Sequence, residues 1–523
     1  MGIYLNPGDE LFWQAVHSEI YVDKTGLLNY TNKVLRTSKK YLCVSRPRRF
    51  GKSMAANMIA AYYDRTVDAS STFARLAIAQ SDDFETYRNK YDVIQLNMQD
   101  FLSRSSSLEG LLSLLKKCLL RDLLKAYPSD EYLDATDLVE TMAEIHAASK
   151  RPFVIVIDEW DCIFREYREK NDWQEAYLDF LRGWLKDKAY VALVYMTGIL
   201  PIKKYGTHSA LNMFREFSME APLELAPYVG FTSEEVRSLC EKYSRSFEEC
   251  QRWYDGYSFQ EAGEVYNPHS VVEAISSGKF DTYWNQTETY EALKIYISMN
   301  FDGLRDSIIK LLAGERQMVN TKTFSNDMTS FQSADDVLTL LVHLGYLGYD
   351  NSKEEVFIPN QEIAREYYNA ITTTDWDIVA RALKQSEKLL QAVLAKDDES
   401  VAKGIEEAHM ETSHIQYNDE NALSYTLSLA FYSARQKYKI FRELPTGKGY
   451  ADLVFLPRPL HAELPALVLE LKWDKNAKAA IQQIRDRHYG KALENYAGKL
   501  LAVGICYDKE TRKHECMIEE YRL

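Results

Sequence analysis

Short apolar runs, each bounded by charged or polar positions, recur through the first part of the chain. They lie at residues 41–45, 93–98, 152–157 and 190–196. A long leucine-rich stretch with helical spacing, 108–127, stands between two of them. Runs of this kind are typical of strands buried in a parallel sheet whose faces are covered by the connecting helices. Residues 1–228 are therefore predicted to form one α/β domain.

The pattern changes after Gly230. A polar segment at 231–235 that ends in two glutamates predicts the capped start of a helix, and helical spacing follows it. Further on, an apolar helix at 335–344 precedes a predicted hairpin at 345–358, which is the order of a winged helix. Such modules bind DNA or serve as packing units, and this helix is not basic. We expect a helical lid and a winged-helix-like region at 229–375.

A second α/β pattern appears toward the C-terminus. Charged helical residues at 376–410 predict a connector, and a further helix is predicted from Asp419. The predicted strands cover 450–456, 466–472 and 500–506, with a helix before the last of them. Residues 376–523 are therefore expected to hold the connector and a restriction-endonuclease-like α/β domain.

Composition excludes several classes of protein. The 523 residues are 46% hydrophobic and 12% aromatic, which is enough for several cores. The formal net charge of −14 excludes a global positive field, so any contact with nucleic acid must be local. The seven cysteines form no CxxC pair, and no apolar run has the length of a membrane span. We expect a cytoplasmic protein with no membrane partner.

Residues 46–53, with the sequence RPRRFGKS, lie between the first predicted strand and a predicted helix. Strand, loop, Gly-Lys-Ser and helix is the order of a phosphate-binding loop. The expected nucleotide ligands are Arg49, Phe50, Gly51, Lys52 and Ser53. Backbone N–H groups would wrap the phosphates of ATP, Lys52 would neutralise their charge, and the Ser53 hydroxyl would bind Mg²⁺. Arg46 replaces the usual first glycine, so a basic loop that only caps the strand stays open as an alternative.

The predicted strand at 152–157 ends in two carboxylates, Asp158 and Glu159. Beside a phosphate loop, Asp158 would reach the Mg²⁺ held by Ser53, and Glu159 would polarise a water toward the γ-phosphate. The alternative is a strand that ends in solvated acids. The next strand ends at Thr197, at the edge of the sheet where ligands bind, which makes this residue a candidate phosphate sensor. Basic residues just beyond it are expected to be solvated, namely Lys203, Lys204 and Arg215.

A second group of charged residues lies on the predicted C-terminal hairpin. Asp452 begins the first strand, while Glu470 and Lys472 are two apart on the second and so project from one face. A salt-bridged hairpin is the simpler interpretation, because charges among apolar neighbours need at least an ion pair. The functional interpretation is a Mg²⁺ site on Asp452, Glu470 and the Leu471 carbonyl. Lys472 would then orient the water that attacks a phosphodiester.

The helix that follows this hairpin is locally basic in an acidic chain. Its basic residues are Lys475, Lys478, Arg485, Arg487 and Lys491. Contact with a nucleic-acid backbone is one use for such a face, and solvation is the other; both stay open.

Several segments together resemble a known family. They are residues 21–25 (YVDKT), 46–53 (RPRRFGKS), 254–259 (YDGYSF) and 266–268 (YNP). These segments are similar to the bacterial AAA-ATPase-like family, and the C-terminal part resembles the PD-(D/E)XK nuclease-like domain that is fused to it. In that family the phosphate loop usually has the RPRRFGKS form, which accounts for Arg46. The proline that often precedes the first nuclease acid is Ala451 here.

The resemblance implies roles for particular residues. Nucleotide and Mg²⁺ would bind at Lys52, Ser53 and Asp158, with Glu159 as the hydrolytic base. The implied nuclease-type site comprises Asp452, Glu470 and Lys472, with Gln483 on the following helix and Glu420 as an outer carboxylate.

The residues and the resemblance together predict an ATP-binding and ATP-hydrolysing protein coupled to a Mg²⁺-dependent nuclease that acts on DNA. ATP and Mg²⁺ are the expected cofactors, nucleic acid is the expected partner, and a homo-oligomer or a protein partner stays open. A role in defence or mobile-element biology is expected by analogy alone. The alternative is an NTP-switched scaffold whose nuclease-like domain grips nucleic acid or protein without cutting it.

Overall fold

The computed structural model of the chain describes most of its residues. The described ranges are 2–202, 204–205, 208–209, 211–284, 289–299, 301, 303–325, 328, 331–372, 377–412, 427, 430–446, 449–458, 461–473, 476–486, 500–508, 511 and 513–521. They form two compact units, Met1–Thr289 with Gln317–Ala364 and Tyr290–Arg316 with Arg365–Leu523. The boundaries expected after residues 228 and 375 stay predictions. No helix in these ranges is long and apolar enough to cross a membrane.

Five parallel strands form the central sheet of the first unit, in the order β2-β3-β4-β1-β7. The strands are β1 Tyr41–Ser45, β2 Asp92–Asn97, β3 Phe153–Asp158, β4 Val191–Gly198 and β7 Arg215–Phe217. Every residue of β1, β3 and β4 is buried, as expected for strands that meet helices on both faces. The apolar runs of the sequence thus form the predicted parallel sheet.

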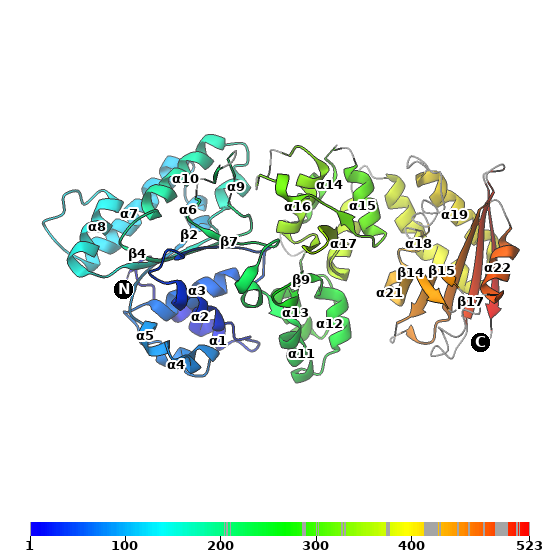
Figure 1. Cartoon of the computed structure of the whole chain (residues 1–523), viewed down its shortest axis with the longest axis horizontal. Helices are drawn as coiled ribbons and strands as arrows, with labels where there is room; N and C mark the ends of the chain where they lie inside the picture. The colour runs from blue at the N-terminus through cyan, green and yellow to red at the C-terminus, as the bar shows by residue number, and fades with distance from the viewer. Residues whose placement is uncertain are drawn as a thin grey trace. The chain divides into compact units, whose positions relative to one another are not determined.

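Helices cover both faces of this sheet (Figure 1). On one face lie α1 Glu10–Val16, α2 Gly26–Val34, α3 Lys52–Tyr63, α4 Ser70–Phe73 and α5 Phe84–Tyr87. On the other face lie α6 Met98–Ser103, α7 Leu108–Ala126, α8 Leu138–Ser149, α9 Cys162–Glu166 and α10 Asn171–Leu185. The helix that follows the phosphate loop, α3, packs on β2, β3 and β4. Its N-terminus is thereby fixed beside the ends of these strands.

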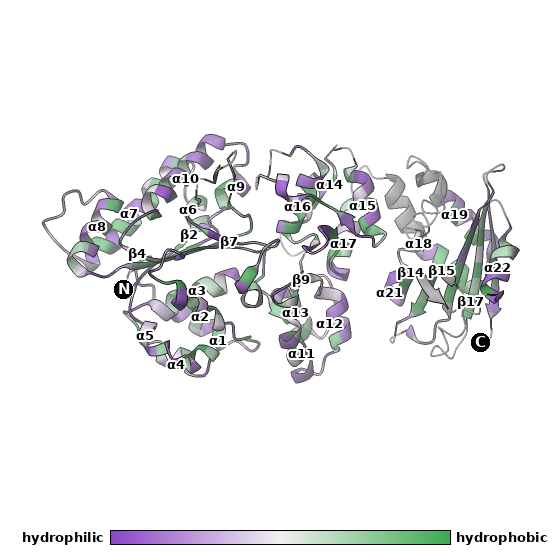
Figure 2. Ribbon diagram, viewed as in Figure 1, coloured by the Kyte–Doolittle hydropathy of each residue, from purple (hydrophilic) through white to green (hydrophobic). Residues whose placement is uncertain are grey.

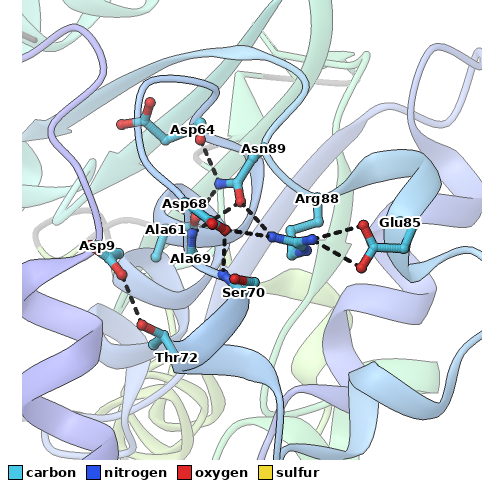
Figure 3. A network of polar contacts seen from close by, with 10 residues as sticks. All are labelled: Asp9, Ala61, Asp64, Asp68, Ala69, Ser70, Thr72, Glu85, Arg88 and Asn89. Carbon is cyan, nitrogen blue, oxygen red and sulfur yellow. Dashed lines mark hydrogen bonds and ion pairs between the residues drawn. The ribbon is translucent and has the colours of Figure 1, made fainter.

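A polar network holds the far end of α3 (Figure 3). Asn89 donates from Nδ2 to the carbonyl oxygen of Asp64, the residue after α3, at 2.6 Å. Arg88 donates to the carboxylates of Asp68 at 3.1 Å and Glu85 at 2.7 Å. Because Asp68 and Glu85 are exposed, these ion pairs contribute little, and the bond to the helix end does most of the anchoring.

A helical region with two small sheets follows the central sheet in the chain. It contains α11 Ser233–Lys242, α12 Phe247–Tyr254, α13 Pro268–Ser277, α16 Ala334–Leu344, β8 Phe231–Thr232, β9 Tyr257–Phe259, β10 Gly263–Tyr266, β11 Gln317–Met318, β12 Gly348–Asp350 and β13 Glu355–Phe357. The predicted capped start is confirmed, because Thr232 and Glu235 form a capping box at α11. The hairpin of β12 and β13 follows α16, with β11 as third strand, which confirms the predicted order of helix and hairpin.

The second unit contains a mixed sheet in the order β14-β15-β16-β17-β18. Its strands are β14 Tyr438–Thr446, β15 Gly449–Pro457, β16 Ala466–Trp473, β17 Leu500–Asp508 and β18 Lys513–Tyr521. Its helices are α14 Thr289–Ile297, α15 Leu304–Leu312, α18 Asp377–Ala395, α19 Asp398–Thr412, α21 Ala434–Lys437 and α22 Ala477–Asp486, and α17 Gln361–Thr372 enters it from the first unit after Ala364. The sequence reasoning did not include β18. The helix predicted from Asp419 begins outside the described residues.

Side chains of the mixed sheet alternate between two cores, and the strands are largely green in Figure 2. Leu453 and Leu469 pack with residues of α18 and α19, whereas Val454 and Val468 pack with α22. Because side chains alternate along a strand, even-numbered residues of β15 and β16 face the α22 side. The α/β architecture with a helical middle and a C-terminal nuclease-like sheet is thus confirmed.

Candidate functional site

The loop between β1 and α3 has the backbone of a phosphate cradle. Gly51, just before α3, has a φ of 87°, and Arg49 has a φ of 67°. A Cβ at Gly51 would have open space around it, so the glycine is favoured here for its backbone conformation. The buried Lys52 ammonium donates to the Pro47 carbonyl oxygen at 2.7 Å. Burial lowers the pKa of Lys52, and the nearby Glu159 carboxylate opposes that effect.

Arg46, which stands in place of the usual glycine, is wholly buried. Its Nη1 donates to the carbonyl oxygens of Ser45, Phe217 and Ser218 at 2.9, 3.0 and 2.9 Å. Its guanidinium lies over the Phe259 ring, 5.3 Å from the centroid. Burial lowers the pKa of Arg46 to about 10, so the group stays charged at neutral pH. Arg46 therefore ties the start of the loop to the end of β7.

Replacing Arg46 with alanine is expected to destabilise the first unit by about 3 kcal/mol, because three carbonyl oxygens lose a charged donor and a cavity remains. The midpoint of thermal unfolding of the full chain, followed by circular dichroism, should fall. Arg48→Ala changes a half-buried arginine of the same loop and should lower the midpoint much less. Equal midpoints for the two variants would contradict this structural role of Arg46.

Asp158 ends β3 within reach of the loop. It is buried, and the Ser53 hydroxyl hydrogen-bonds its carboxylate. Burial raises the pKa of Asp158 to about 6, against the effect of that hydrogen bond. A hydroxyl beside a carboxylate offers the oxygen ligands that Mg²⁺ prefers, so the two residues fit the predicted metal role. In the sheet register, Asp158 lies next to Thr197, which is also buried.

Glu159, the predicted base, is held by an arginine. Its backbone is left-handed, with a φ of 53°, and its carboxylate pairs with Arg165 of α9. The Nε of Arg165 lies 3.3 Å from Oδ2 of Asp161, which is buried. The same oxygen accepts the backbone N–H groups of Ile199 and Leu200 at 3.0 and 2.8 Å. One arginine–aspartate pair thus joins the predicted base to the turn after β4.

A cavity of about 810 Å³ adjoins the loop. Its charged and polar lining includes Arg48, Arg49, Lys52, Ser53, Glu159 and Arg165. Its apolar lining includes Phe12, Ile20, Val22, Met54, Phe231 and Val272. The groups at the helix N-terminus are suited to the phosphates of a nucleotide, and the apolar walls are suited to its base. Neither Asp158 nor Thr197 is part of this lining.

Sequence reasoning missed several of these residues. Phe231 and His269, which line the cavity, looked like helix-start and turn residues. An aromatic residue at a helix start and a histidine in a turn are common in any fold, so the sequence offers no signal for them. Asp161 and Arg165 do leave a weak signal, because an acid and an arginine one helical turn apart directly follow the strand acids.

Among the basic residues after β4, the structure describes the side chain of Arg215. Arg215 donates to the Tyr30 hydroxyl at 2.8 Å and pairs with Glu224 at 2.8 Å. Lys203 lies outside the described residues. Arg215 is therefore held by its neighbours and is not part of the lining of the nucleotide cavity.

In the second unit, Asp452 and Glu470 are neighbours across two strands. The register of β15 and β16 places them opposite each other, on one face. The Asp452 carboxylate accepts the backbone N–H of Leu471 at 2.7 Å. The Nζ of Lys472 lies 3.5 Å from Oε1 of Glu470, which is buried. Two carboxylates and a lysine therefore meet at one place, as their spacing predicts.

These groups offer part of a metal site. Two carboxylates and the Leu471 carbonyl are hard oxygen donors of the kind that bind Mg²⁺. Among the described residues, no three His, Cys, Asp or Glu side chains gather at one metal position. Glu420, the predicted outer carboxylate, lies outside the described residues. The donor set therefore fits Mg²⁺ when carbonyl or water ligands complete it.

Helix α22, which carries the half-buried Gln483, approaches this site closely. Gly504 is the register partner of Glu470, and a Cβ there would lie 2.5 Å from the Ala477 carbonyl oxygen. The absence of a side chain at Gly504 thus lets the N-terminal end of α22 lie beside Glu470. Glu515 of β18, which sequence reasoning missed, accepts the backbone N–H of Ala477 at 3.1 Å and caps that end.

The predicted basic helix face is described only in part. Lys478 is exposed, and Arg485 pairs with Glu519. The other members lie outside the described residues, namely Lys475, Arg487 and Lys491.

Fold and site define two classes of domain in this chain, a phosphate-loop domain and a mixed-sheet domain with paired acids and a lysine. Residues 15–207 match the family described as a predicted AAA-ATPase, and residues 419–516 match the PD-(D/E)XK nuclease superfamily. The chain therefore matches an AAA-ATPase-like family in its first part and the PD-(D/E)XK nuclease superfamily in its last part, which is the combination that the resemblance implied.

Similar proteins span the chain to different extents. A protein described as uncharacterized, in the vnfD 5′ region of Azotobacter chroococcum mcd 1, is 23% identical over 512 residues, covering 94% of this chain and 93% of that protein. The ORC2 protein of Aeropyrum pernix, in ADPNP-ADP complexes, overlaps with a TM-score of 0.31 and 13% identity over 68% of this chain and 97% of that chain. Cdc6p from Pyrobaculum aerophilum overlaps with a TM-score of 0.25 and 10% identity over the same shares. TM-scores this low carry no argument about fold or function.

Proposed function

We propose that this chain binds and hydrolyses ATP in its first unit and cleaves DNA with Mg²⁺ in its second. The observation that carries the proposal is that one chain holds both arrangements. One is the cavity in which phosphate-binding groups adjoin apolar walls. The other is the meeting of Asp452, Glu470 and Lys472 on one face of a sheet. Binding and hydrolysis of ATP regulate or move the protein, and cleavage of DNA is the reaction that they control.

In the first site, phosphates bind at the N-terminus of α3. Lys52 exchanges its bond to the Pro47 carbonyl for a phosphate oxygen, and the backbone N–H groups of the loop surround the same group. Ser53 and Asp158 are the residues that hold Mg²⁺, which when bound neutralises charge on the transferred phosphoryl group. Glu159 orients the attacking water and accepts its proton. The apolar side chains of the lining enclose the base.

Arg165 acts on this site through Glu159. Its guanidinium pairs with the Glu159 carboxylate and so sets the position of that carboxylate, and its own position is set by Asp161. Thr197, one strand away from Asp158, is the proposed phosphate sensor. Asp161 also accepts hydrogen bonds from the turn after β4. A change at the phosphates therefore reaches β4 through Glu159, Arg165 and Asp161.

In the second site, Asp452, Glu470 and the Leu471 carbonyl are the residues that hold Mg²⁺, which when bound stabilises charge on the scissile phosphate. Lys472 orients the attacking water, and the Glu470 carboxylate keeps its ammonium in place. Gln483 assists from α22. The Leu471 N–H fixes the Asp452 carboxylate before any ligand arrives.

The setting of this activity is also a proposal. All seven cysteines are free, which supports a reducing, cytoplasmic compartment. DNA is the proposed partner, and defence or mobile-element biology is the setting suggested by analogy. A homo-oligomer or a protein partner stays open.

A second candidate function is an NTP-switched scaffold, in which the nuclease-like domain grips nucleic acid or protein without cutting. The formal net charge of −14 favours this candidate, because an acidic chain repels nucleic acid outside local contacts. It differs from the first candidate in a single measurable step, phosphodiester cleavage.

Plasmid cleavage by the full chain separates the two candidates. Supercoiled DNA is incubated with Mg²⁺ or Mn²⁺, with and without ATP, and phosphate release from ATP is measured in the same samples. Nicked or linear product that EDTA abolishes supports the nuclease. ATP hydrolysis without product in any condition supports the scaffold, and the absence of both ATP binding and cleavage contradicts both.

A further inference from the structure

A buried glutamate lies at the start of α17, in neither proposed catalytic site. The side chain of Glu362 is 1% exposed. Its Oε1 accepts the backbone N–H groups of Tyr283 and Trp284 at 2.7 and 3.0 Å. The Ser270 hydroxyl donates to Oε2 at 2.9 Å. One carboxylate thus fastens three elements together: α17, the 283–284 turn and α13.

The same turn receives an arginine of the phosphate loop. Arg49 donates from Nη1 to the carbonyl oxygen of Tyr283 at 2.9 Å. Burial raises the pKa of Glu362 to about 7, and the charge of Arg49 is among the influences that oppose this rise. Arg49 and Glu362 therefore bind the same turn with opposite charges, Arg49 at the carbonyl oxygen of Tyr283 and Glu362 at the N–H groups of Tyr283 and Trp284.

Arg49 also lines the nucleotide cavity. So does His269, next to Ser270 at the start of α13, and burial followed by the charge of Arg49 lowers the pKa of His269. The arginine is thus within electrostatic reach both of the cavity and of Glu362. A triphosphate carries more negative charge than one carboxylate, so it would attract Arg49 more strongly.

Building on the proposed ATP site, we propose that Glu362 competes with bound nucleotide for Arg49. A triphosphate draws Arg49 away from the Tyr283 turn and leaves the Glu362 carboxylate without its counter-charge. A buried carboxylate that loses its counter-charge is costly, and the proton that it takes up instead makes it a weaker acceptor for the N–H groups of Tyr283 and Trp284, so the turn and the start of α17 loosen. The chain leaves the first unit at Ala364, within α17, so this rearrangement acts on the segment that leads to the second unit.

Charge and hydrogen bonding at Glu362 can be separated by one substitution. In Glu362→Gln the amide oxygen still accepts from Tyr283 and Trp284, and the amide nitrogen donates to the Ser270 hydroxyl oxygen. The contacts remain, and only the negative charge is lost. Glu248→Gln is the matched control, because Glu248 is an exposed glutamate of α12 in the same unit.

The test uses the full chain, with a fluorescent ATP analogue for affinity and hydrogen exchange of peptides that contain Tyr283 and Trp284. In the native chain, ATP should speed exchange of these amides by about tenfold. Glu362→Gln should bind the analogue about tenfold more tightly, because no negative charge then competes for Arg49, and ATP should no longer change exchange. Glu248→Gln should behave as the native chain.

The outcomes separate this inference from the proposed function. Weaker binding by Glu362→Gln indicates a purely structural role and overturns the inference alone. The inference alone is also overturned if Glu362→Gln binds the analogue with native affinity and its exchange responds to ATP as in the native chain. A native chain that binds no nucleotide overturns the proposed ATP site and the inference with it. If Glu362→Gln does not fold, Arg49→Ala decides at saturating ATP: the inference requires that ATP no longer changes the exchange of the Tyr283 and Trp284 peptides, and a native response overturns it.

Discussion

Replacing Lys52 with alanine is expected to lower ATP hydrolysis by roughly 100-fold or more and to weaken ATP binding. In the structure the Lys52 ammonium is buried at the N-terminus of α3 and donates to a loop carbonyl, so it is placed to neutralise phosphate charge when nucleotide binds. Alanine removes that charge, and the backbone cradle alone remains. Binding of a fluorescent ATP analogue and phosphate release by the full chain measure the two effects.

The control for this experiment is Lys33→Ala. Lys33 is an exposed lysine of α2 in the same unit, so its loss changes the net charge by the same amount without touching the cavity. Native binding and hydrolysis are expected for this control. Native ATP binding by Lys52→Ala would contradict the nucleotide site itself.

Replacing Asp452 with asparagine is expected to lower Mg²⁺-dependent cleavage of plasmid DNA by roughly 100- to 1000-fold. Asparagine keeps an oxygen that accepts the Leu471 N–H, so the hairpin should stay folded. It removes one of the two negative charges that face each other across β15 and β16, and with it the attraction for a divalent cation. Gel analysis of nicked and linear product measures the change.

Glu399→Gln serves as the control for the nuclease site, because Glu399 is an exposed acid of α19 in the second unit. It should cleave as the native chain does. Cleavage that survives Asp452→Asn at the native rate would show that another site cuts DNA. Equal ATP hydrolysis in both variants would show that the first unit is unaffected.

The parts of both sites that could be predicted are those whose chemistry is local in sequence. The loop at 46–53 and the acids after β3 are contiguous motifs, and their spacing identifies them without knowledge of the fold. Glu470 and Lys472 could be placed on one face because side chains of a strand alternate with period two. The apolar runs identified strands of the first unit for a different reason, because strands covered on both faces are apolar throughout.

The parts that escaped prediction depend on partners far apart in the chain. Arg46 binds carbonyl oxygens of β7, and Glu362 binds a turn and a helix that precede it by many residues. A buried arginine and a buried glutamate look like surface residues in a sequence, because such groups are rarely buried without partners. The strand β18 and its Glu515, which caps α22, were missed because an alternating polar strand at the edge of a sheet has a weak apolar signal.

The bonds made by Arg46 have a consequence for the comparison of related sequences. Its hydrogen bonds go to the main-chain oxygens of Ser45, Phe217 and Ser218, and every type of residue carries such an oxygen. Relatives that keep an arginine at this position are free to vary the side chains at the three partner positions. We therefore expect an arginine that persists through evolution with no co-varying partner, so that methods which infer contacts from correlated substitutions would overlook this link between the phosphate loop and β7.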